Sequence, residues 1–191
     1  MPRSNRKAKS QTTDIASRIT PSPKLNADLT VAGVISPARG LDRLTFDGYA
    51  LTWHGAGGKS WRAFSGTPDE SADEATADIG PTPQGLFAVD PGNVEDLVPT
   101  DDWGSHRVKI EPYAATVDRM KDCFKVIRTG MYIHGGNATG THGCIEINDN
   151  ADEEEFFKKL VSYGKKIELE VRYSGAREKK YEATACPYPP P

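Results

Sequence analysis

The chain has 191 residues, of which 37% are hydrophobic and 27% are charged, close to ordinary globular usage. Its formal net charge of -3 lacks the basic excess of nucleic-acid-binding proteins, and no stretch approaches the ~18 apolar residues of a membrane span. The 18 glycines and 14 prolines favour turns and short strands over long helices. We therefore expect one globular domain with flanking segments.

Composition divides the chain into three parts. Residues 1–40 are polar, are interrupted by proline and carry about +5, which leaves about -8 on the remainder. We expect them to form a flexible basic N-terminal arm, because no apolar secretory region follows the basic start. Residues 41–175 are expected to form the folded domain. Residues 176–191 are expected to form a Pro-rich C-terminal tail, which cannot pair as a central strand.

Strand patterns dominate the folded domain. Arg43–Gly55 predicts two strands around Asp47-Gly48, a strong hairpin signal. Asp69–Asp78 is acidic and is expected to be a solvated loop. The other segments with strand patterns are Gly58–Gly66, Gly80–Asp90, His106–Tyr113, Phe124–Gly136 and Lys166–Tyr173.

One helix is predicted after residue 149. Asn150 and Glu153 have capping-box spacing, and Gly164 is placed to end the helix. Its apolar face consists of Phe156, Phe157, Leu160 and Val161. The chain as a whole predicts a mainly β fold, an antiparallel sandwich or barrel-like domain with one or two short helices.

The stretch Tyr132–Ile147 (YIHGGNATGTHGCIEI) is the most informative for chemistry. Apolar residues at both of its ends predict two strands, and a Gly-rich connector would bring the end of the first beside the start of the second. This places His134 near Cys144. A neighbouring imidazole can lower the pKa of a thiol and make it a useful nucleophile. Backbone N–H groups at Gly143 and Cys144 can stabilise an oxyanion, so the pattern indicates acyl transfer.

The other cysteines and histidines have structural interpretations. Cys123, Cys144 and Cys186 are too few for a disulfide framework, and without a secretory signal we expect reduced thiols. Cys123 is expected to be buried, and His54 and His106 are expected to be structural. A metal site built from His134, His142 and Cys144, with Cys123 as a further ligand, is an alternative, although its spacing matches no usual zinc site.

The motifs around these residues resemble a known family. Thr141-His142-Gly143-Cys144-Ile145 resembles the signature of the L,D-transpeptidases, and His134 in Tyr-Ile-His-Gly-Gly occupies the place of that family's general base. Thr82–Phe87 (TPQGLF) is similar to the family's entry to a core strand. The resemblance covers residues 42–172. The short connector between His134 and Thr141 is closest to a compact branch that includes type VI secretion effectors.

The resemblance implies a role for each site residue. Cys144 would be the nucleophile, with catalytic roles for His134, His142 and Gly135; His142 alternatively holds a loop. Gly143 and Cys144 would supply the oxyanion N–H groups. The residues implied for substrate binding are Thr141, Arg107 and Arg128. The family's common Arg or Asn after the cysteine is missing, since Glu146-Ile147-Asn148 follows here, so Arg107 and Arg128 are candidates to bind the substrate carboxylate.

The implied function is modification of peptidoglycan stem tetrapeptides through a Cys144 thioester, without a cofactor or metal. The outcome would be transpeptidation, L,D-carboxypeptidation or D-amino acid exchange. We expect a secreted antibacterial effector that lacks a Sec signal, acts in the periplasm of a target cell, and has a secretion carrier and an immunity protein as partners. The alternatives are a resident cell-wall L,D-transpeptidase and a non-catalytic wall-binding or metal-binding module on the same fold.

Overall fold

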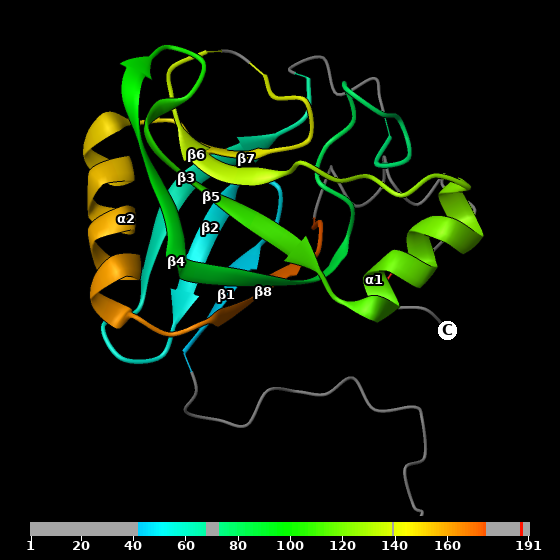
Figure 1. The fold of residues 1–191 in the computed structure, drawn as a ribbon, viewed down its shortest axis with the longest axis horizontal. Helices are drawn as coiled ribbons and strands as arrows, with labels where there is room; N and C mark the ends of the chain where they lie inside the picture. The colour runs from blue at the N-terminus through cyan, green and yellow to red at the C-terminus, as the bar shows by residue number, and fades with distance from the viewer. Residues whose placement is uncertain (1–41, 68–72, 139, 175–187, 189–191) are drawn as a thin grey trace, which may run out of the picture. The chain divides into compact units, whose positions relative to one another are not determined.

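The computed structural model describes residues 42–67, 73–138, 140–174 and 188. The arm expected over residues 1–40 lies outside the described residues, as does the expected tail apart from Tyr188. Eight strands form a closed barrel in the order β1-β2-β3-β7-β6-β5-β4-β8 (Figure 1). They are β1 (Arg43–Phe46), β2 (Ala50–His54), β3 (Lys59–Ser65), β4 (Gly85–Thr100), β5 (Gly104–Pro112), β6 (Tyr132–Gly135), β7 (Ile145–Ile147) and β8 (Ile167–Val171). The prediction of a mainly β fold is confirmed.

Alternation of apolar and polar residues along the strands builds the barrel interior. Strands β1, β2 and β8 direct every second side chain inward, as Leu44 and Phe46 do on β1. The inward-facing residues of the other strands include Leu51, Trp53, Trp61, Phe87, Val89, Val108, Ile110, Ile133, Ile145, Ile147, Ile167, Leu169 and Val171. Closure of the barrel leaves no free edge among these strands.

Strand pairing is mostly, but not entirely, antiparallel. The predicted hairpin is present: β1 pairs with β2, and the Asp47 carboxylate accepts the backbone N–H groups of Tyr49 and Ala50 at 2.8 Å. Among the described strands, however, β1 runs parallel to β8 and β6 runs parallel to β7. The expectation of an antiparallel sheet is therefore wrong for these two pairs, and the β6–β7 pair determines the site geometry.

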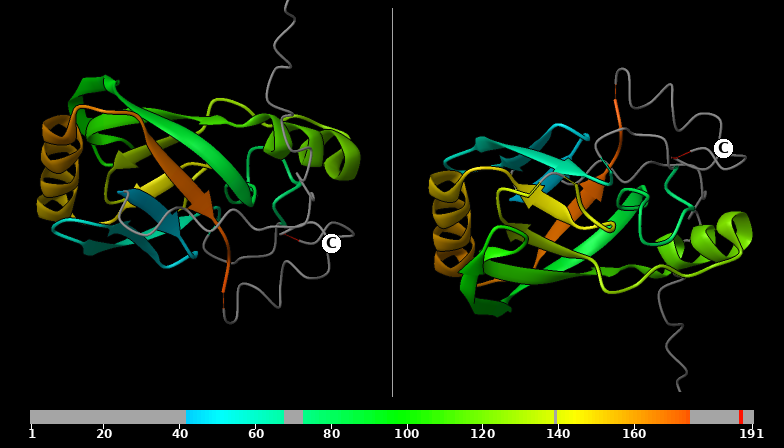
Figure 2. Two further views of the ribbon diagram at one scale, coloured as in Figure 1. Left: turned by 90° about the horizontal axis from the view of Figure 1, so that it is seen from below. Right: turned by 90° about the horizontal axis from the view of Figure 1, so that it is seen from above.

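Helix α2 (Asn150–Tyr163) packs against the core on one side of the barrel, and α1 (Ala114–Arg119) lies on the opposite side (Figure 2). Phe156, Phe157 and Leu160 attach α2 to the core. Gly164 ends the helix in the left-handed conformation, as predicted. The N-cap is Asp149, one residue before the predicted Asn150. The Asp149 side chain accepts the backbone N–H groups of residues 151 and 152. No helix in the described ranges is long and apolar enough to span a membrane.

The segment after α1 corrects two sequence predictions. A π-helical turn, η1 (Met120–Phe124), follows α1, and strand β6 begins only at Tyr132, so Phe124–Gly136 is not one strand. Cys123 lies half-buried in η1 and is disulfide-bonded, whereas Cys144 is free. The expectation that the thiols are all reduced is therefore wrong. Cys186, the third cysteine in the sequence, lies outside the described residues.

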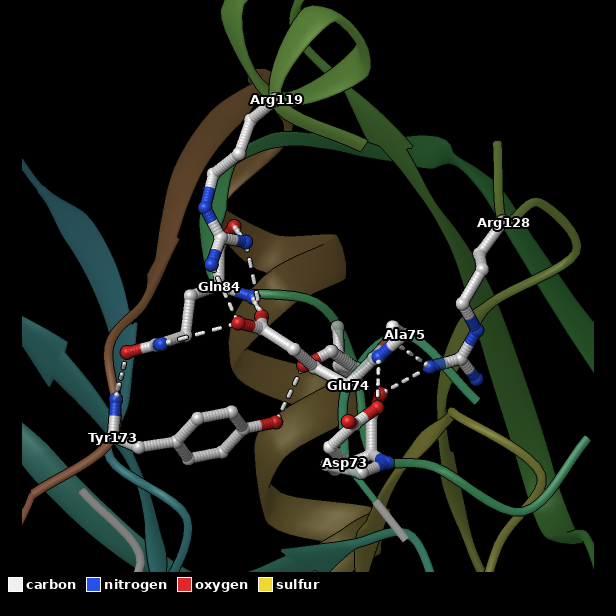
Figure 3. Close-up of polar contacts among 9 residues, drawn as sticks. Asp73, Glu74, Ala75, Gln84, Arg119, Arg128 and Tyr173 are labelled. Carbon is white, nitrogen blue, oxygen red and sulfur yellow. Dashed lines mark hydrogen bonds and ion pairs between the residues drawn. The ribbon is translucent and has the colours of Figure 1, made fainter. Parts of the chain in front are cut away.

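The acidic segment before β4 is not simply a solvated loop. Glu74 is fully buried and forms an ion pair with Arg119, while its carboxylate also accepts the backbone N–H of Gln84 at 2.6 Å (Figure 3). The Gln84 side chain in turn accepts the backbone N–H of Tyr173 at 3.0 Å. A buried carboxylate requires such partners, because an unpaired charge in the interior is strongly destabilising. The network fixes residues 73–84 against the barrel.

Candidate active site

The pairing of β6 with β7 gathers the chemically active side chains on one face. Ile133 pairs with Ile145, and His134 pairs with Glu146. Because both isoleucines point into the core, the residues beside them point to the other face of the sheet. Cys144 immediately precedes β7 and lies two residues from Glu146, so it shares this face with His134. The β6–β7 register thus places Cys144, one residue before β7, on the same face as His134.

His134 is held in one tautomer by the main chain. Its Nδ1 lies 2.5 Å from the carbonyl oxygen of Gly135. Since a carbonyl only accepts hydrogen bonds, Nδ1 carries the proton and Nε2 is left with a free lone pair. Burial, with 3% of the residue exposed, lowers the pKa of His134 and keeps the imidazole neutral. Gly135, expected among the catalytic residues, supplies the orienting acceptor that a Cys–His pair requires.

Cys144 is a free and buried thiol, with 7% of the residue exposed. Burial raises the pKa of Cys144, and a backbone hydrogen bond with Tyr132 and the nearby Arg128 and Arg107 oppose this shift only in part. The sequence-based expectation that His134 lowers this pKa is therefore wrong, because desolvation dominates. The resting pair is a neutral thiol beside a neutral imidazole.

Two threonine hydroxyls hold the two peptide groups of Cys144. The Thr82 hydroxyl donates to the carbonyl of Gly143 at 2.8 Å, and the Thr141 hydroxyl donates to the carbonyl of Cys144 at 2.7 Å. Both threonines are anchored at the end of β3, Thr82 to Ser65 and Thr141 to Gly66. Thr141, expected to bind substrate, is buried and uses its hydroxyl to fix the loop.

Arg128 also fixes the loop around the cysteine. Its buried guanidinium donates to the carbonyl of Glu74 at 2.9 Å (Figure 3). It also donates to the carbonyl of Gly80 at 3.0 Å, with further bonds to those of Pro81 and His142. Gly143 has a φ of 104°, and a Cβ there would overlap this guanidinium. Glycine is therefore required both by backbone conformation and by the approach of Arg128. With these donors bound to carbonyls, Arg128 is placed to shape the loop.

Arg107 lies on the same face as the Cys–His pair, since it pairs with His134 across β5 and β6. Its guanidinium is held by Glu95 at 2.7 Å and stacks over Trp103 and Tyr132, with 5.2 and 4.9 Å to the ring centroids. The Trp103 ring also lies 4.8 Å from that of His134. Arg107 is thus the predicted substrate-binding arginine that the structure brings beside the base. No motif in the sequence indicated that Trp103 would lie at this site.

Glu146 is a further residue that sequence reasoning did not assign to the site. It is fully buried directly across from His134. Burial raises the pKa of Glu146 to about 8, although the neighbouring Asn148 side chain opposes the shift. The side chain is therefore a neutral acid at pH 7. A glutamate between two isoleucines was the only signal in the sequence.

The remaining histidines lie in other surroundings. His142 is exposed and lines a shallow pocket beside the cysteine loop. The other residues that line this pocket are Ala77, Asp78, Val126, Ile127, Arg128 and Thr129. His106 stacks on Phe157, and His54 contacts the Thr45 hydroxyl at 2.8 Å. Within the described ranges, no group of three or more His, Cys, Asp or Glu residues is arranged to hold a metal ion.

The chain was compared with family models and with curated protein sequences. No family model matches it, and no curated protein sequence matches it. The geometry and chemistry of the site therefore have to carry the functional argument. The fold is a closed β-barrel in which a buried cysteine immediately precedes β7, and a main-chain-oriented histidine lies on the adjacent parallel strand β6.

Proposed function

We propose that the protein is a peptidoglycan-modifying cysteine acyltransferase of the L,D-transpeptidase type, acting on stem tetrapeptides. The observation that carries the proposal is the β6–β7 pairing, in which His134 lies opposite Glu146, two residues after the free thiol of Cys144. The resemblance of the Thr141–Ile145 motif to that family supplies the substrate class. No cofactor is needed for this chemistry.

In the proposed reaction, Nε2 of His134 takes the proton of the Cys144 thiol as the sulfur attacks a peptide carbonyl of the stem. The carbonyl oxygen becomes an oxyanion near the Cys144 backbone N–H. The C–N bond then breaks, and His134 returns the proton to the leaving amine of the terminal D-amino acid. The remaining tripeptide is bound as a thioester. An acceptor amine or water attacks this thioester, loses its proton through His134 and regenerates the thiol.

The neutral resting pair supports this order of steps. Burial disfavours both the thiolate and the imidazolium, so the ion pair is best formed when substrate is present to be attacked. His134 in the Nδ1–H tautomer presents the nitrogen that this transfer needs. Arg107, whose guanidinium borders the same face, is the residue we assign to the substrate carboxylate.

We further propose that the protein acts outside the cytoplasm, as an antibacterial effector in the periplasm of a target cell. Its substrate lies there, and the disulfide at Cys123 is typical of oxidising compartments. Expression of the protein with an added export signal should damage growth and cell shape, whereas cytoplasmic expression should be tolerated. Equal growth with exported wild-type protein and exported Cys144→Ala would count against the effector role.

The enzymatic proposal is tested by incubating purified stem tetrapeptides with the protein, with and without a free D-amino acid. Mass spectrometry should reveal tripeptide, exchanged tetrapeptide or cross-linked product. Cys144→Ala should give none of these, and Cys123→Ala should retain most activity once its fold has been verified. Product formation by Cys144→Ala would contradict the mechanism.

A further inference from the structure

The buried hydroxyl of Thr82 lies in a directed hydrogen-bond chain that ends at the cysteine loop. Thr82 has a single hydroxyl proton, and the carbonyl of Gly143, 2.8 Å away, can only accept it. The Ser65 hydroxyl, 3.0 Å from Thr82 Oγ1, can then donate to Thr82, and it accepts the Thr82 backbone N–H at 2.8 Å. The chain thus runs from Ser65 through Thr82 to Gly143.

This chain sets the direction of a peptide group in the site. In a trans peptide, the carbonyl of Gly143 and the N–H of Cys144 point in opposite directions. A hydrogen bond that fixes the carbonyl toward Thr82 also fixes the Cys144 N–H away from it. Thr141 holds the following peptide group through the Cys144 carbonyl, so Cys144 has little freedom to rotate.

Thr82 is itself rigidly placed. Its backbone carbonyl accepts the hydroxyl of Tyr173 at 2.5 Å, and the neighbouring Gln84 is bound to the buried Glu74–Arg119 ion pair (Figure 3). Thr82, Ser65 and Glu74 are all fully buried. The Thr82 hydroxyl is therefore held in a fixed position.

We propose that Thr82 is a positioning residue that orients the Cys144 N–H toward the oxyanion of the acyl-transfer step. This inference rests on the proposed function. Preorganised N–H donors stabilise the developing charge on a carbonyl oxygen, and a misdirected donor loses that effect. Alkylation of a thiol by iodoacetamide forms no oxyanion, so it does not depend on this donor.

The two reactions of Cys144 separate this role from a structural one. In Thr82→Val, acylation of Cys144 by a stem tetrapeptide should slow by at least about tenfold, in kcat more than in KM. Alkylation by iodoacetamide should stay within about twofold of wild type, and Thr82→Ser should restore acylation. Thr52→Val is the matched control, because Thr52 forms a similar 2.8 Å pair with Ser60 on β2 and β3.

Each outcome decides the proposal. Equal slowing of alkylation and acylation in Thr82→Val would assign Thr82 to loop folding alone, and wild-type acylation in this variant would remove the role altogether. If Thr82→Val does not fold, Ser65→Ala replaces it and should show the same selective loss, in smaller degree. Wild-type protein that is alkylated at Cys144 but acylated by no stem peptide would overturn the proposed function and this inference with it.

Discussion

Gly135 of β6 lies so close to Glu153 of α2 that a Cβ on the glycine would overlap the glutamate carboxylate. The same carboxylate accepts the backbone N–H groups of Ser105 and His106 at 2.7 and 2.8 Å. One buried side chain of the helix therefore links β5 and β6 at the point where the Gly135 carbonyl orients His134. Through this contact, the helix supports His134, the base of the proposed reaction.

Gly135→Ala tests this contact. The added methyl group must displace Glu153 or β6, and overpacking of this kind costs about 1–3 kcal/mol. We expect a loss of that size in the free energy of unfolding, measured with urea, together with reduced acyl transfer. Gly92→Ala, at an exposed glycine, should change stability by less than about 0.5 kcal/mol. A Gly135→Ala protein as stable as Gly92→Ala would contradict the assignment.

Glu146 predicts a pH-dependent stability. Its pKa rises from 4.5 to about 8 on folding, so the folded state binds more protons than the unfolded state between these values. As the pH rises from about 5 to about 8, the free energy of unfolding of wild type should therefore fall relative to that of Glu146→Gln. The expected slope is about 1.4 kcal/mol per pH unit. Below pH 4 the difference should be constant.

The control for this experiment is Glu154→Gln, an exposed glutamate on α2. Its stability should follow that of wild type across the whole pH range. Parallel stability curves for wild type and Glu146→Gln would show that the Glu146 carboxyl is not held neutral in the folded protein.

The neutral thiol and imidazole predict shifts in two pH dependences, that of Cys144 alkylation and that of acyl transfer. Because burial raises the pKa of Cys144, alkylation by iodoacetamide should keep increasing at pH values where an ordinary cysteine is fully ionised. Because burial lowers the pKa of His134, acyl transfer should persist below pH 6.5, the pKa of an ordinary histidine. Alkylation that reaches its plateau near pH 7 would instead indicate a preformed thiolate–imidazolium pair.

The disulfide at Cys123 predicts the thiol content of the protein. Under native, oxidising conditions we expect Cys144 to react as a free thiol and Cys123 to be protected, and three thiols after denaturation and reduction. Peptide mapping should recover Cys123 in a disulfide-linked peptide, and loss of this link should cost about 2–4 kcal/mol of stability. Three free thiols in protein purified from an oxidising compartment would contradict the disulfide.

Local patterns made part of this structure predictable. Asp47-Gly48 marked the first hairpin, alternation marked most of the strands, and Gly164 marked the end of α2. The glycines and apolar flanks around His134 and Cys144 correctly indicated adjacent strands. In each of these cases, the residues that determine the structure lie close together in the sequence.

The features that sequence reasoning missed depend on distant partners. Glu74 is buried because Arg119, which lies 45 positions away, pairs with it. The acidic segment around Glu74 had therefore been predicted wrongly as a solvated loop. The role of Thr82 depends on Gly143, and Trp103 meets His134 only because the β4–β5 turn reaches it. The raised pKa of Cys144 follows from burial that no local motif reports.

The proposed reaction requires a covalent bond between Cys144 and the substrate. Wild-type protein mixed with a stem tetrapeptide and quenched in acid should carry a tripeptide adduct, which peptide mapping should place on the segment that contains Cys144. His134→Gln should form this adduct much more slowly. An adduct on a residue other than Cys144 would contradict the proposed reaction. So would product formation by the wild type with no adduct formed on Cys144.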